Sequence, residues 1–179
     1  MVEHQTSDAA GGERLRFGVD LLLFVLSLFF LGLVYMYWHL RAGAERIVLR
    51  DEASANLALV CSVFAALAAW LAVGFNWLGR TRTWPAAHAL SCTVTGLGLL
   101  LTMVALHAWV GAGYTAGAGR ASFALLVLGA AQALALCVAW MWMAVVLHRP
   151  ANGVAAGLAG RLLVLVAVVA SIVALLPGP

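Results

Sequence analysis

Charged residues are scarce in this sequence of 179 residues, where they make up 9% of the chain against 65% hydrophobic residues. A soluble domain carries about 25% charged residues. No soluble fold of this length could keep so much apolar surface away from water. The composition therefore excludes a water-soluble globular protein, and it leaves room for one helical bundle without a separate soluble domain.

Lysine is absent, so all ten basic residues are Arg, and nine of them lie in the N-terminal segment and in the connections between apolar stretches. A net charge of +3 that is spread in this way does not indicate a nucleic-acid partner. The three cysteines form no CxxC pair, and Cys61, Cys92 and Cys137 each lie within an apolar stretch. Cysteines in such surroundings act as small hydrophobic residues.

Five long apolar stretches account for nearly all of the chain. An α-helix needs about 20 apolar residues to cross the hydrocarbon layer of a bilayer, and each stretch is long enough. Backbone groups in lipid must bond within helices or within a closed barrel, and these stretches lack the alternation of barrel strands. The sequence therefore predicts an all-α integral membrane bundle of five transmembrane helices. The five stretches are Phe17–Leu40, Asn56–Leu78, Ala86–Gly111, Ser122–Leu147 and Val154–Leu176.

The first sixteen residues, MVEHQTSDAAGGERLR, are polar and predict a flexible N-terminal tail. They do not form a signal peptide, because acidic residues dilute the positive charge and the apolar run that follows is too long. We therefore expect two parts, a tail over residues 1–16 and a five-helix transmembrane domain over residues 17–179.

Aromatic residues gather at the ends of the first two stretches. Aromatic rings favour the level of the lipid headgroups, and the two tryptophans of the second group flank Arg80 and Arg82. The expected interface anchors are Tyr35, Tyr37, Trp38, Trp77 and Trp84.

The second stretch carries small residues at helical spacing, including Ala65, Ala69 and Ala72. Small residues let helices approach closely in a membrane, where no hydrophobic drive brings them together. We expect this face to pack against a neighbouring helix.

The arrangement of Arg residues indicates the orientation of the chain. With the N-terminus inside, the inner segments carry six Arg and the outer segments four. Cytoplasmic loops are the ones enriched in Arg. We expect an integral protein of the bacterial inner membrane with a cytoplasmic N-terminus and a periplasmic C-terminus. The inner set is Arg14, Arg16, Arg80, Arg82, Arg149 and Arg161, and the outer set is Arg41, Arg46, Arg50 and Arg120.

Asp20 is the one carboxylate that falls within an apolar stretch. A charge deep in lipid costs about 3 kcal/mol or more, so such groups face protein or water and often serve function. Asp20 also follows Arg14 and Arg16 closely enough to lie at the headgroup level. Two interpretations stay open: an interfacial carboxylate, or a contact with a partner or with a proton path.

Histidines are the other candidates for chemistry. In the expected topology His39 and His107 lie toward the outer side, and His88 and His148 lie toward the inner side. Two bis-histidine haems would fit this placement, but interfacial histidines are common and no metal-ligand spacing or catalytic motif is present. We expect no catalytic residue, no cofactor and no metal site in this chain.

Four segments carry a resemblance to a known family. They are LFVLSLFFLGLVYMYWHLR (Leu23–Arg41), NLALVCSVFAALAA (Asn56–Ala69), the segment Leu99–Tyr114 and the segment Phe123–Arg149. Their order and spacing resemble subunit III of haem-copper cytochrome oxidases, in the short five-helix type that includes relatives associated with nitric oxide reductase. In the first segment the matching residues are Ser27, Phe29, Phe30, Gly32, Tyr37, Leu40 and Arg41.

The resemblance implies a non-catalytic accessory subunit that packs on the catalytic subunit I, binds phospholipid and steadies turnover. It implies that haem and copper belong to partner subunits, and that the first helix, with Asp20, faces the catalytic subunit. The polar groups of the family are replaced by Leu28, and by Ala131 and Leu134 beside Gln132, so their roles are not expected here. Two alternatives stay open, a small haem-binding electron-transfer protein and a membrane assembly factor.

Overall fold

The computed structural model describes residues 2–42, 52–81, 85–112, 119–148 and 153–176, and it has five helices there with no strand in the described parts. All five helices contain a segment long and apolar enough to cross a membrane, so the chain is an integral membrane protein. The predicted fold class, an all-α bundle of five transmembrane helices, is confirmed. The helices are α1 (Val2–Ala42), α2 (Glu52–Thr81), α3 (Pro85–Ala112), α4 (Gly119–His148) and α5 (Gly153–Leu175).

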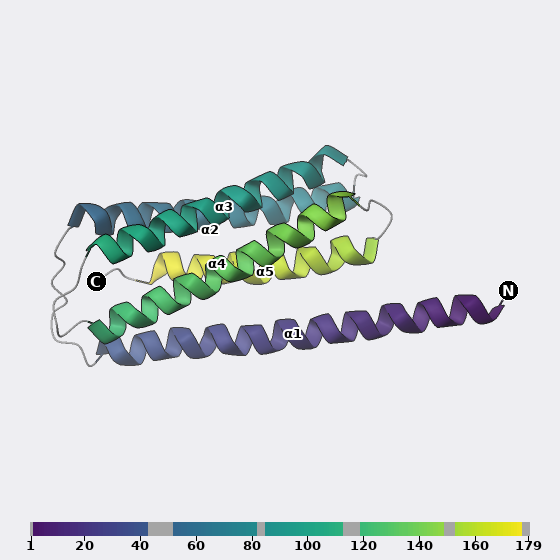
Figure 1. The fold of residues 1–179 in the computed structure, drawn as a ribbon, viewed down its shortest axis with the longest axis horizontal. Helices are drawn as coiled ribbons and strands as arrows, with labels where there is room; N and C mark the ends of the chain where they lie inside the picture. The colour runs from purple at the N-terminus through teal and green to yellow at the C-terminus, as the bar shows by residue number, and fades with distance from the viewer. Residues whose placement is uncertain (1, 43–51, 82–84, 113–118, 149–152, 177–179) are drawn as a thin grey trace.

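The helices lie side by side along one common direction, and the two chain termini lie at opposite ends of the bundle (Figure 1). The most extensive contact joins α2 to α3, and α5 packs against both α2 and α4. Within the described parts of the chain, α1 touches α4 and α5 and neither of the other two helices. Its span is also the least buried of the five, so α1 lies at the edge of the bundle.

Helix α1 differs from the expectation at its N-terminal end. It begins at Val2 and runs for 41 residues without a break at residue 16, where we expected the tail to end. A helix of this length extends for about 60 Å, roughly twice the thickness of the hydrocarbon layer. Its polar N-terminal part therefore projects beyond the other helices (Figure 1). Good helix formers such as Ala, Glu and Arg, with no Pro, explain the continuity. The flexibility of this segment stays a prediction.

The contact between α2 and α3 is built from small residues. Ala65, Ala69 and Ala72 of α2 are fully buried. A Cβ added at Gly98 of α3 would lie 3.7 Å from the carbonyl oxygen of Ala65, which shows how closely the two backbones approach. Ser91 of α3 donates a hydrogen bond of 2.8 Å from its Oγ to the carbonyl oxygen of Ala72. Close approach and an interhelical hydrogen bond therefore act together here.

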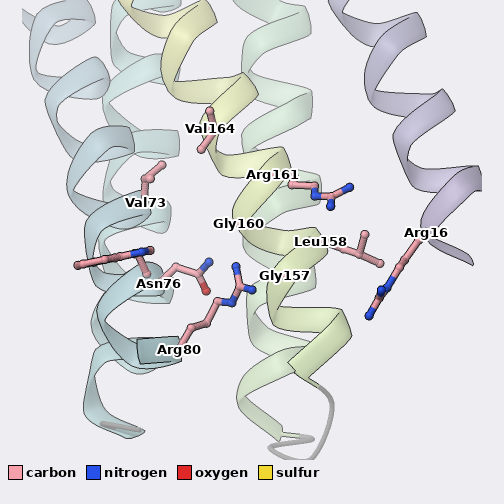
Figure 2. A pocket seen from close by; sticks show the side chains of 10 residues that line it. Arg16, Val73, Asn76, Arg80, Gly157, Leu158, Gly160, Arg161 and Val164 are labelled. Atoms are coloured by element: carbon pink, nitrogen blue, oxygen red, sulfur yellow. The ribbon is translucent and has the colours of Figure 1, made fainter. Parts of the chain in front are cut away.

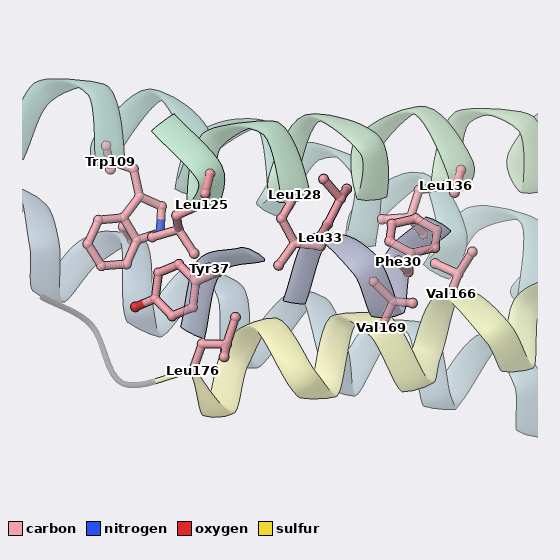
Figure 3. Close-up of a cluster of buried hydrophobic side chains, with 14 of the residues drawn as sticks. Phe30, Leu33, Tyr37, Trp109, Leu125, Leu128, Leu136, Val166, Val169 and Leu176 are labelled. Atoms are coloured by element: carbon pink, nitrogen blue, oxygen red, sulfur yellow. The ribbon is translucent and has the colours of Figure 1, made fainter. Parts of the chain in front are cut away.

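A second packed region joins α1 to α4 and α5 (Figure 3). Phe30, Leu33 and Tyr37 of α1 are all buried there, because residues spaced by three, four and seven lie on one face of a helix. Only 2% of Tyr37 is exposed, so its ring packs inside the bundle and does not face the lipid as an interface anchor. Tyr35 and Trp38, on the other side of the helix, are 71% and 53% exposed.

Two expected anchors remain, Trp77 and Trp84. Trp77 is exposed near the C-terminal end of that helix, as an interfacial ring would be. Trp84 lies outside the described residues.

Candidate functional site

The main polar feature of the described residues is a cleft of about 830 Å³ at the end of the bundle where the transmembrane span of α1 begins, α5 begins and α2 ends. Three arginines from three different helices line it: Arg16 of α1, Arg80 of α2 and Arg161 of α5 (Figure 2). Val73 and Val164 lie on the wall toward the middle of the bundle (Figure 2). The cleft is therefore basic at the membrane surface and apolar toward the membrane interior.

Glycines of α5 bring the long side chains of α2 against its backbone. A Cβ at Gly157 would lie 3.5 Å from the Nη2 atom of Arg80. A Cβ at Gly160 would lie only 2.7 Å from the Nδ2 atom of Asn76, closer than real Cβ atoms approach. Any side chain larger than Gly at position 160 would thus displace Asn76, so this glycine shapes the floor of the cleft.

Asn76 is the buried polar group of this site, with 2% of its surface exposed. Its Nδ2 atom donates a hydrogen bond of 3.4 Å to the carbonyl oxygen of Ala156 at the start of α5. Its Oδ1 atom is buried and accepts no hydrogen bond from the described residues. A buried acceptor without a donor is costly, so the Asn76 amide is only half satisfied by the described residues.

Asp20 of α1 forms an ion pair and hydrogen bond with Arg161 of α5. Both side chains are about half exposed, at 52% and 55%. The bond joins the edge helix to the rest of the bundle at the level of the cleft. The structure shows that Asp20 pairs with Arg161 of the same chain. A contact of Asp20 with another subunit or with a proton path stays a prediction.

The charges of the cleft do not balance. Asp20 is bonded to Arg161, and no carboxylate of the described residues lies within ion-pair distance of Arg16 or Arg80. For Arg80 and Arg161 the sequence explains this imbalance, because it contains no Asp or Glu after Glu52. Among the side chains that the structure describes at the cleft, three positive charges face one negative charge, a formal balance of +2.

Sequence reasoning placed Asp20 but missed its partner. The spans Arg16–Leu40 and Ala156–Leu175 belong to helices that cross in the same direction, and Asp20 and Arg161 lie near the beginning of each. The ion pair could have been predicted from these positions, because Asp20 and Arg161 carry opposite charges at a similar depth in two parallel spans. The part played by Arg80 and Asn76 had no such signal, because it depends on which helix packs against α5.

The histidines that could have held haem are not gathered in the bundle interior. His39 and His107 are both exposed, and the ring of His39 stacks on Tyr35 with 6.1 Å between the centroids. His88 is half-buried against Gly79 of α2. The side chain of His148 is not among those described. In the described parts of the chain, no three His, Cys, Asp or Glu residues come together in a group that could hold a metal ion.

Most other buried polar side chains bond to the helix backbone. Ser62 donates to the carbonyl oxygen of Ala58 at 2.8 Å, and Thr95 donates to that of Ser91 at 2.7 Å. Such bonds satisfy a hydroxyl without a partner from another helix. Gln132 of α4 is also buried, and its Oε1 atom has no hydrogen-bond donor among the described residues.

The arrangement of the described residues thus offers a basic cleft and no constellation of nucleophile, acid and base. Arginines that converge from three helices suit the binding of an anion, because guanidinium groups stay charged and present several donors at once. Comparison of the chain with family models, with curated proteins and with solved structures finds no match.

Proposed function

We propose that this protein is a non-catalytic accessory subunit of a respiratory haem-copper oxidase, similar to subunit III. In this role it packs against the catalytic subunit, stabilises it and binds phospholipid, while haem and copper are held by partner subunits. The proposal rests on the resemblance of the segments from Leu23 to Arg149 and on one structural observation, the exposed apolar groove on the outer face of α1.

The outer face of α1 carries an apolar groove of about 600 Å³ that centres on Gly32. Leu28, Leu31 and Trp38 form its walls, and all three are more than half exposed. A Cβ added at Gly32 would meet no atom within 4 Å, so nothing in the described chain fills the groove. The resemblance directs this helix toward the catalytic subunit, and a glycine-based groove is the kind of surface that admits a neighbouring helix closely.

The interior of the bundle supports a scaffold role. Its buried hydroxyls donate to backbone carbonyl oxygens, and the three histidines whose side chains are described lie at the surface or against a glycine. These positions serve packing between helices and assemble no group of acid, base and nucleophile.

We further propose that the protein lies in a bacterial inner membrane, with its N-terminus in the cytoplasm and its C-terminus in the periplasm. The excess of Arg in the segments on the N-terminal side supports this orientation. The cleft that gathers Arg16, Arg80 and Arg161 lies on the same side.

Purification of the tagged full chain in mild detergent, followed by mass spectrometry of the proteins that accompany it, tests the function. The catalytic subunit of a haem-copper oxidase is expected in fixed ratio to the chain. Recovery of the chain without any oxidase subunit, from membranes that contain active oxidase, would overturn the proposal.

Two matched glycine variants test the groove. Gly32→Leu fills the groove with a side chain that contacts nothing in this chain, so it is expected to lower recovery of the catalytic subunit while the chain still folds. Gly74→Leu on α2 is the control, because Gly74 is also exposed and also has no atom within 4 Å of an added Cβ. Equal recovery with both variants would contradict a contact through the outer face of α1.

A further inference from the structure

The charge balance of the described residues in the cleft favours an anion. Arg16 and Arg80 have no carboxylate of the described residues within ion-pair distance, and Arg161 shares one with α1. Charges at the edge of the hydrocarbon layer are costly unless they are paired or solvated, and clefts of one sign concentrate ions of the other. An anion that bridges Arg16 and Arg80 would offset this charge.

The cleft suits a phosphate group. Guanidinium groups bind phosphate oxygens through two parallel hydrogen bonds, and the three arginines extend from separate helices toward one space (Figure 2). Its volume of about 830 Å³ is in the usual range for small-ligand sites.

The depth of the cleft selects a lipid over a free ion. Arg16 is the first residue of the α1 span and Arg80 the last but one of the α2 span, so both lie where lipid phosphates lie. Val73 and Val164 continue the cleft with apolar surface toward the membrane interior. A phospholipid can occupy both parts at once, with its phosphate among the arginines and its acyl chains along the apolar wall, whereas inorganic phosphate can use only the first.

We propose that this cleft is a binding site for the phosphate group of an anionic phospholipid, held by Arg16, Arg80 and Arg161. Basic pockets between transmembrane helices on the cytoplasmic side are known to bind anionic headgroups, and that leaflet is the one on which we place the cleft. Asp20 limits the site, because its bond to Arg161 occupies one guanidinium edge and keeps that side chain on the side of the cleft nearest α1. The inference rests on the phospholipid binding proposed above and gives it a site, but its test uses this chain alone and does not depend on an oxidase partner.

Native mass spectrometry of the purified full chain tests the site. The delipidated protein is titrated with phosphatidylglycerol and, separately, with phosphatidylcholine of the same acyl chains. One molecule of phosphatidylglycerol is expected to bind in preference to phosphatidylcholine. Arg80→Gln is expected to weaken phosphatidylglycerol binding about tenfold, since a hydrogen bond to a charged group is lost. Arg120→Gln is the control, because it removes the same charge from the first turn of α4, at the other end of the bundle.

Arg16→Gln provides a second variant, because Arg16 is exposed and without an ion-pair partner in the described chain, so its loss leaves the packing intact. The proposal would be overturned if the two lipids bind equally. It would also be overturned if Arg120→Gln and Arg80→Gln weaken the binding of phosphatidylglycerol equally. A separate arm measures thermal stability with inorganic phosphate alone. Stabilisation by phosphate equal to that by phosphatidylglycerol would overturn the assignment to a lipid.

Discussion

The carboxylate of Asp20 and the guanidinium of Arg161 form an ion pair between residues 141 positions apart in the chain. It joins α1 to α5, and Phe30, Leu33 and Tyr37 of α1 are buried in the packed region that α1 forms with α4 and α5. The pair is therefore a polar contact that fixes where the edge helix lies along its length. Apolar contacts alone would allow a helix to slide more easily, because they lack direction.

Replacement of Asp20 by Asn keeps the shape of the side chain and removes its charge. Because both partners are about half exposed, the expected loss of stability is small, about 0.5–1 kcal/mol. Unfolding in detergent should measure it for Asp20→Asn, for Arg161→Gln and for the double variant. The double variant should cost less than the two single variants added together, because the second change removes a charge that has already lost its partner. Additive losses would show that the pair does not couple the helices.

Replacement of Gly160 by Ala should loosen the contact between α2 and α5. The new Cβ would lie 2.7 Å from the Nδ2 atom of Asn76, a buried amide that is itself bonded to Ala156. Overpacking of this kind costs about 1–3 kcal/mol, against a gain of up to about 1 kcal/mol from helix propensity. The melting temperature should therefore fall. Gly74→Ala, which meets no atom within 4 Å, should leave the melting temperature unchanged or raise it.

The hydroxyl of Ser91 should contribute more to stability than that of Ser62. Ser91 donates across the contact to Ala72 of α2, whereas Ser62 donates within its own helix to Ala58. Interhelical hydrogen bonds in membranes contribute on average about 0.6 kcal/mol, and up to about 1.7 kcal/mol. Unfolding of Ser91→Ala and Ser62→Ala in the same detergent compares the two buried serines. A larger loss for Ser62→Ala would contradict the importance of the interhelical bond.

The isolated chain is expected to show no haem absorbance. His39 and His107 are exposed and His88 lies against Gly79, so these three side chains do not face one another across the bundle as haem ligands would. A visible absorbance spectrum of the purified chain measures this directly. A haem band that disappears in His88→Ala or His107→Ala would contradict the scaffold role and support the alternative of an electron carrier.

The transmembrane helices could be predicted from the sequence because length and hydropathy alone decide whether a segment spans a bilayer. The direction of single side chains was harder to predict. Tyr37 and Trp38 are neighbours in an aromatic cluster, yet only the second faces outward. An aromatic side chain suits both a headgroup layer and a packed core, so composition does not distinguish the two.

The cleft could not be predicted from the sequence, because it depends on which helices pack together and not on the pattern of residues within one helix. Asp20 was visible as a charge in an apolar stretch, but Arg80 and Asn76 became part of a site only because α5 presents Gly157 and Gly160 to them. Two glycines in a Gly-rich stretch carry no sequence signal of what they face. The pairing of helices far apart in the chain supplies that information, and it follows from the packing of the whole bundle.

The position of α1 at the edge also has a consequence for the synthesis of the protein. The described part of α1 meets only α4 and α5, the last two helices to leave the ribosome. At about 5–20 residues per second, the 141 residues between Asp20 and Arg161 take roughly 7–30 s to translate. During that interval α1 lies in the membrane without its neighbours in the bundle and with its carboxylate unpaired to Arg161. Helix α1 therefore enters the membrane well before either of the helices that it packs against.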